Sequence, residues 1–258
     1  MQNFKRLFKI FKDKRITTVA GAWVFYFLTA LLPIVFLLFI AFGVFGINLH
    51  SSILSLIPNE FKNIAETLFL TAENATKGIT IFFAFAVLFS GSALLHQMLK
   101  DGEFIYNSTT IKRNPIIKRM LSLFALSVPF IIFLALAFLL AFQGAILKFF
   151  SIENEVIVLL IIIGLVTLIG FVIILLLNFF VSPIKQRLSK MLIGSLVSLA
   201  IITVGTLSFM FYLRFFKPYS AFYGSLASII MFLIWSYILM LGLVFGVSIN
   251  ASIYEKNY

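Results

Sequence analysis

The sequence predicts an all-α polytopic membrane protein. Six transmembrane helices are expected, with an amphipathic external helical segment and a short basic N-terminal helix. Composition supports this class: 62% of residues are hydrophobic, only 11% are charged, and the mean hydropathy is +1.13. Soluble domains contain roughly 45–50% apolar and about 25% charged residues. A soluble fold of 258 residues could not cover so much apolar surface, which indicates a second apolar solvent, the bilayer.

The second observation is that six stretches lack Asp, Glu, Lys and Arg: 16–49, 78–99, 120–147, 156–184, 191–213 and 218–254. Each stretch is long enough for a spanning helix, which needs about 20 residues. Runs of this length fit helices better than the roughly ten-residue strands of a barrel. We therefore expect a single membrane domain, 1–258, with spans at about 21–47, 79–98, 120–147, 156–181, 192–213 and 222–251.

The distribution of basic residues predicts the orientation. Fifteen of the 20 Lys and Arg residues lie in the N-terminus, the second and fourth connections and the C-terminus. The positive-inside rule then places both termini in the cytoplasm, in the bacterial inner membrane. This asymmetry accounts for the net charge of +11, so no nucleic-acid partner is expected.

Two segments outside the spans have amphipathic patterns. Residues 4–11 place phenylalanines and Leu7 on one helical face and basic residues on the other, which predicts a helix bound to anionic lipid head groups. Residues 52–72 carry an apolar stripe typical of an external surface helix. Ordinary packing on neighbouring spans is the alternative for both.

The informative residues of a membrane protein are the polar and small ones within its spans. No acidic or basic residue is expected at mid-depth, which argues against ion-coupled transport. Milder polar groups and small residues gather on helical faces. The candidates in the first five spans are Tyr26, Thr29, Pro33, Gln143, Asn178, Ser208 and Tyr212.

The sixth span has Gly242 and Gly246 in GxxxG spacing, with Asn250 one turn further. Two interpretations of all these faces remain open. Small residues allow close helix contact and polar ones hydrogen-bond across it; alternatively, the faces line an internal polar cavity.

Enzyme chemistry is not expected. The chain has no cysteine, and its two histidines, His50 and His96, fall at opposite ends of the membrane. The cytoplasmic acids have no metal-ligand or paired-carboxylate spacing. We therefore expect neither a metal nor another cofactor.

Residues 20–39, AGAWVFYFLTALLPIVFLLF, and 222–251, FYGSLASIIMFLIWSYILMLGLVFGVSINA, resemble the YihY/BrkB family of bacterial inner-membrane proteins. Residues at motif positions of that family include Tyr26, Pro33, Tyr223, Gly224, Trp235, Tyr237 and Asn250. The chain departs from the family at Ser248, where an acidic residue is usual, and at Ile193, where proline is common.

The resemblance implies a six-helix inner-membrane protein, with some relatives tied to envelope lipid or lipopolysaccharide transport and others to serum resistance. It leads to two hypotheses: translocation of a lipid or amphipathic envelope molecule, or a non-transporting membrane scaffold or partner-binding subunit. An older ribonuclease label for the family is disfavoured, because the sequence offers no metal site.

Overall fold

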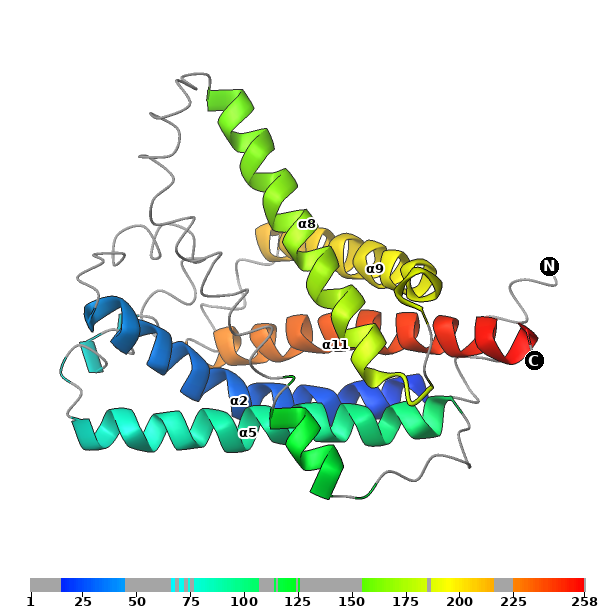
Figure 1. Ribbon diagram of the computed structural model, residues 1–258. Helices are drawn as coiled ribbons and strands as arrows, with labels where there is room; N and C mark the ends of the chain where they lie inside the picture. The colour runs from blue at the N-terminus through cyan, green and yellow to red at the C-terminus, as the bar shows by residue number, and fades with distance from the viewer. Residues whose placement is uncertain are drawn as a thin grey trace.

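The computed structural model describes residues 15–44, 66–67, 70–71, 74, 77–106, 114, 116–123, 125, 155–184, 187–215 and 225–257. Its long helices are α2 (Ile16–Val44), α5 (Lys77–Ile105), α8 (Glu155–Val181), α9 (Leu188–Phe215) and α11 (Ser225–Asn257) (Figure 1). Residues 116–123 form a further helical segment, and no strand occurs within these described ranges. The predicted all-α class is therefore confirmed.

Four of the described helices are long and apolar enough to cross a membrane: Gly78–Ile105, Leu160–Val181, Leu188–Tyr212 and Ile229–Glu255. Ile16–Leu31 forms a shorter apolar helix at the first predicted span. The third predicted span is described only at 120–123 and 125, where it is helical. The polytopic membrane character is confirmed, whereas the count of six spans and the orientation stay predictions.

Parts of the expected organisation lie outside the described residues. They include the basic N-terminal helix at 4–11 and most of the external segment at 52–72. Within that segment, residues 66–67 and 70–71 are helical and exposed.

Helix α5 continues beyond the expected span end at residue 98, and Asp101 in its last turns accepts a hydrogen bond from Trp23 of α2. Helix α8 ends at Val181, two residues before Pro183, which lacks a backbone N–H and restricts the residue before it. The Ser182 hydroxyl donates to the Ile184 carbonyl 3.2 Å away within the turn toward α9.

The helices pair in a defined order. Helix α2 lies along α5, α9 lies along α11, and α11 also packs against α2, so that α11 links the two pairs. Helix α8 packs mainly on α9 and leans away from the other helices along its length (Figure 1). This tilt concentrates packing at one end of the bundle.

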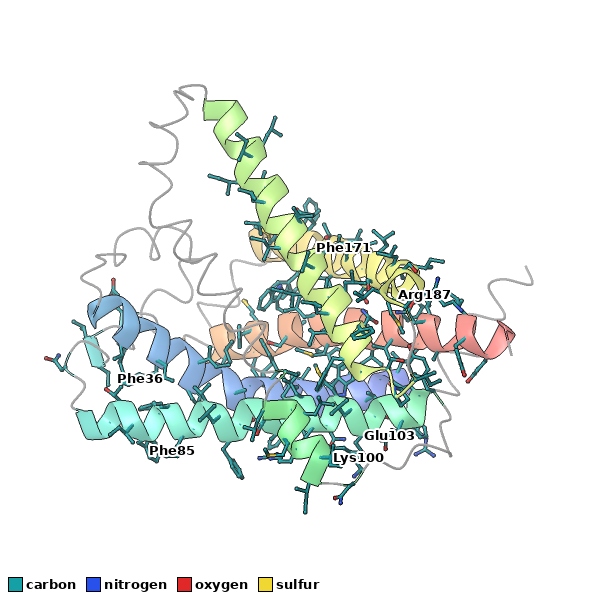
Figure 2. All side chains as sticks on the ribbon, in the orientation of Figure 1. Phe36, Phe85, Lys100, Glu103, Phe171 and Arg187 are labelled. Carbon is teal, nitrogen blue, oxygen red and sulfur yellow. The ribbon has the colours of Figure 1, made fainter. Side chains whose placement is uncertain are left out.

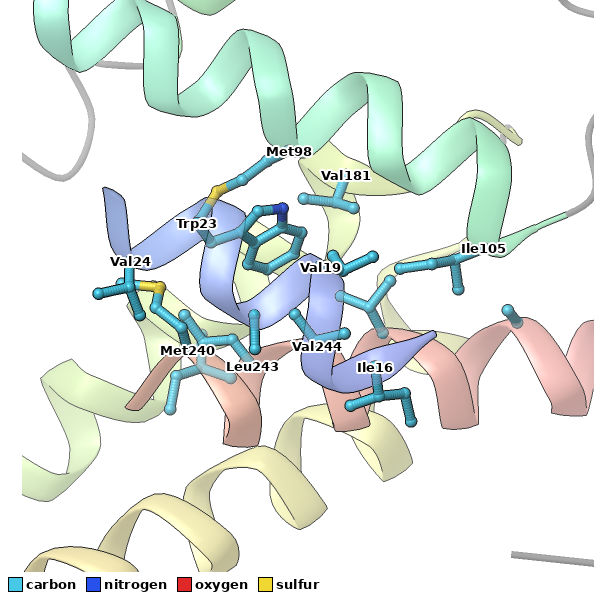
Figure 3. Close-up of a cluster of buried hydrophobic side chains, with 14 of the residues drawn as sticks. Ile16, Val19, Trp23, Val24, Met98, Ile105, Val181, Met240, Leu243 and Val244 are labelled. Carbon is cyan, nitrogen blue, oxygen red and sulfur yellow. The ribbon is translucent and has the colours of Figure 1, made fainter. Parts of the chain in front are cut away.

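The hydrophobic core occupies the end where α2 and α9 begin and where α5, α8 and α11 finish. Figure 3 shows its centre, with Trp23 between α5 and the buried side chains of α2 and α11. Trp23 is 1% exposed and Val244 is fully buried.

Small residues allow α9 and α11 to approach closely. A Cβ on Gly194 would overlap the carbonyl oxygen of Gly246, and one on Gly246 would overlap the Ser198 hydroxyl. Further along the pair, a Cβ on Gly242 would lie 2.7 Å from Ile202. The GxxxG spacing of α11 therefore serves helix contact, as small residues do in membrane bundles.

Candidate functional site

The main buried polar cluster of the described chain joins α8, α9 and α11. The Asn250 side chain accepts a hydrogen bond from the Gly194 backbone N–H at 2.9 Å. Its amide nitrogen donates to Asn178 Oδ1 at 3.2 Å and to the Met191 carbonyl at 3.3 Å. Asn178 in turn donates to the Ile174 carbonyl at 3.0 Å. We call Asn178, Met191, Gly194 and Asn250 the asparagine junction.

This junction is a closed contact. Asn178 is 1% exposed and Asn250 is 2% exposed. Both amides find protein partners, which meets the requirement that polar groups in an apolar interior be hydrogen-bonded. At these two residues, the helix-contact interpretation of the polar faces describes the geometry better than a water-filled cavity.

A second polar cluster joins α2 to the last turns of α5. The Trp23 indole Nε1–H donates to Asp101 Oδ2 at 2.8 Å. Gln97, one turn earlier on α5, donates to both Asp101 oxygens at 3.0 and 3.1 Å. Sequence reasoning missed this cluster, although a buried indole needs an acceptor. The signal available was a tryptophan near one end of a span and an acid just past the end of the next.

The end of α5 is also tied to α9. Tyr106 is 3% exposed, and its hydroxyl lies 3.8 Å from the sulfur of Met191. Burial raises the pKa of Tyr106 to about 12, although a hydrogen bond with Ser182 opposes the shift. The hydroxyl therefore stays protonated at neutral pH and acts as a structural donor.

The α2 candidates lie apart from the asparagine junction. Thr29 is exposed, and its hydroxyl donates to the Tyr26 carbonyl 2.9 Å away. Tyr26 is half-buried, with its ring edge-on to Phe25 at 5.4 Å. Pro33 lies inside α2 and is also half-buried.

The other candidates are also dispersed. Ser208 and Tyr212 are exposed on α9, and Tyr237 packs beside the core. The Trp235 indole donates to the Thr206 hydroxyl at 3.4 Å, a separate contact between α11 and α9. Gln143, Tyr223 and Gly224 lie outside the described residues. Among the predicted site residues, Asn178 and Asn250 are joined by a hydrogen bond between two helices, whereas Thr29 and Tyr26 bond within α2.

One face of α8 changes from buried to exposed along its length. Ile174, Asn178 and Val181 share this face and are buried. The same face continues toward the start of the helix through Thr167, Ile163 and Leu160, by the 100° turn per residue of an α-helix. Those residues are exposed, Leu160 by 63% and Ile163 by 53%. We call Leu160, Ile163 and Thr167 the open face of α8.

Potential metal ligands are dispersed in the described part of the chain. Within the described ranges, no three His, Cys, Asp or Glu side chains gather closely enough to hold an ion.

Similarity to known proteins assigns the family. A sequence model described as virulence factor BrkB matches residues 7–258. The chain belongs to the BrkB virulence factor family. The BrkB match covers all five labelled helices, and with them the asparagine junction and the open face of α8.

Curated relatives carry the name UPF0761 membrane protein. Those from the Dugway 5J108-111 and RSA 331 strains of Coxiella burnetii are each 36% identical over 83 residues, which is 31% of this chain. The alignment spans 30% of the relatives' own length. No solved structure matches the chain. The names of these relatives specify a membrane protein, the family description specifies a virulence factor, and neither names a reaction.

Proposed function

We propose that the chain translocates a lipid or another amphipathic envelope molecule across the inner membrane. The observation that carries this proposal is the change from burial to exposure along one face of α8, from Asn178 to Ile163. In a bilayer, the open face of α8 would contact lipid on the side by which the helix otherwise packs on its neighbours.

The bundle is closed at the end where α8 finishes, which supports translocation with a defined direction. A Cβ on Gly102 of α5 would overlap the Val181 carbonyl of α8, so these backbones lie in close contact. The asparagine junction binds α8 to α9 and α11 at the same end. Under the predicted topology, the protein would be closed toward the cytoplasm and open to lipid nearer the external leaflet.

The open face matches an amphipathic substrate. Leu160 and Ile163 offer apolar surface to acyl chains, and the Thr167 hydroxyl lies on the same side of the helix. Packing of α8 onto its neighbours along its whole length would close the open face and displace a bound molecule. Packed helix interfaces change between such discrete arrangements.

A second function, a membrane scaffold or partner-binding subunit, is favoured by the asparagine junction. Its amides pair directly with protein groups, as expected where helices only pack. In that case the open face of α8 would receive a helix of another membrane protein.

Reconstituted protein distinguishes these functions. Fluorescent phospholipid in proteoliposomes, reduced from outside by dithionite, reports translocation as loss of the protected inner-leaflet signal. We expect translocation above that of protein-free vesicles, slowed by Thr167→Trp on the open face. Leu168→Trp is the matched control, since Leu168 is exposed on another side of α8. Rates equal to protein-free vesicles would contradict translocation and favour the scaffold.

A further inference from the structure

Two adjacent basic side chains on the helical segment 116–123 reach in opposite directions along α5. This segment crosses in front of α5 in Figure 1. Lys118 Nζ forms an ion pair with Glu103 Oε2 at 2.6 Å, near the end of α5. The Arg119 guanidinium instead lies 5.0 Å from the centre of the Phe89 ring, and one of its nitrogens is 3.4 Å from the Phe89 carbonyl.

The two acids in the last turns of α5 bind other side chains. Glu103 pairs with Lys118, and Asp101 accepts from Trp23 and Gln97. No carboxylate forms an ion pair with Arg119 within the described part of the chain. The Phe89 carbonyl is shared with the Ser92 hydroxyl at 2.9 Å, and a guanidinium carries five N–H donors. Arg119 therefore has hydrogen-bonding capacity for an anion.

His96 and Lys100 add polar and basic groups on the same stretch of α5. His96 is within electrostatic reach of Lys100, Lys118 and Arg119. Its Nδ1 atom is buried and has no hydrogen-bond partner among the described residues. His96 therefore lies near three basic side chains and one carboxylate, Glu103, which already pairs with Lys118.

The surroundings of this cluster are apolar and exposed. Phe89 is 73% exposed, Ile116 is 72% exposed and Met120 is 65% exposed. A soluble anion would leave these side chains uncovered, whereas a phospholipid would cover them with its acyl chains. Guanidinium groups bind phosphate oxygens with strong, charge-assisted hydrogen bonds.

We propose that Arg119 and Phe89, with His96 beside them, form a binding site for the phosphate group of an anionic phospholipid. The site lies on the lipid-facing side of α5. It would hold a lipid whether or not the protein translocates one, so its test is separate from that of the proposed function.

Native mass spectrometry of the purified full chain tests the site. The protein is titrated with phosphatidylglycerol, with phosphatidylcholine and with inorganic phosphate. We expect retention of phosphatidylglycerol to fall about tenfold in Arg119→Gln, the loss expected for one charge-assisted hydrogen bond. Arg187→Gln, which removes an exposed arginine elsewhere, should leave retention unchanged.

Further variants and ligands keep the test decisive. If Arg119→Gln does not fold, Arg119→Lys and Phe89→Leu replace it, and each should lower retention severalfold through loss of the fork geometry or of the ring contact. Equal retention by wild type and the folded variants would overturn the site. Displacement of the lipid by inorganic phosphate, or equal binding of phosphatidylcholine, would overturn its assignment to an anionic lipid.

Discussion

The amide of Asn250 on α11 donates a hydrogen bond to the side-chain oxygen of Asn178 on α8, 72 residues earlier in the chain. The two residues hold together helices that diverge toward the other end of the bundle (Figure 2). This bond lies where α8 changes from packed to open. The asparagine junction therefore holds the C-terminal end of α8, whereas Leu160 and Ile163 in its N-terminal half are exposed.

Loss of the junction should reduce stability. Asn250→Leu leaves the Gly194 N–H and the Asn178 oxygen without their partner and should cost about 1–3 kcal/mol of unfolding free energy. Asn178→Leu should cost less, because Asn250 retains Met191 and Gly194. Thermal unfolding in detergent measures both, with Thr167→Leu on the open face as a neutral control. A midpoint equal to wild type for Asn250→Leu would show that the junction is not formed.

Gly246 lies in a close helix contact, whereas Gly170 faces open space. Gly246→Ala should lower the unfolding midpoint by several degrees, because its Cβ would overlap Ser198 and force α9 and α11 apart. Gly170→Ala on α8 meets nothing within 4 Å and should be neutral or slightly stabilising. Yield and thermal midpoint of the two variants, prepared in parallel, give the comparison. Similar losses at both positions would contradict the close approach of α9 and α11.

The two tryptophans should differ in their contribution to the free energy of unfolding. Trp23→Phe removes a 2.8 Å hydrogen bond to Asp101 from a side chain that is 1% exposed. We expect a loss of about 1–3 kcal/mol, since the donor serves a charged acceptor. Trp235→Phe removes only the 3.4 Å contact to Thr206 and should cost less. A double-mutant cycle with Asp101→Asn should show coupling for Trp23 and none for Trp235.

The predicted orientation can be tested by cysteine labelling, because the native chain has no cysteine. Asn74 and Ser189 are both exposed in the structure. A cysteine at position 74 should react with an impermeant maleimide in spheroplasts, and one at position 189 should react only after permeabilisation. The reverse pattern would place both termini on the outer side.

The sequence was sufficient for the membrane class because long charge-free runs leave few alternatives to helices in lipid. It also indicated a close helix contact for α11, since glycines in GxxxG spacing point to close approach, but it did not identify α9 as the partner. The partner of each polar residue was less accessible. Asn178 and Asn250 were candidates on separate spans, and only helix packing in three dimensions shows that they bond to each other.

Three features could not be obtained from residue order. The Trp23–Asp101 contact depends on the register of α2 against α5, which hydropathy does not encode. Arg119 was assigned to a connection by its position before residue 120, because a sequence does not show which way a long side chain extends. The open face of α8 has the same cause: its apolar residues suit lipid and protein neighbours equally well.

The most direct measurement of the open face of α8 uses spin labels on single cysteines at positions 167 and 174. Both lie on one side of the helix, but Thr167 is exposed and Ile174 is 6% exposed. In lipid bilayers, the label at 167 should be mobile and accessible to dissolved oxygen, and the label at 174 should be immobile and shielded. A label at 167 as immobile and shielded as that at 174 would show that α8 packs along its whole length, which would contradict an opening to lipid.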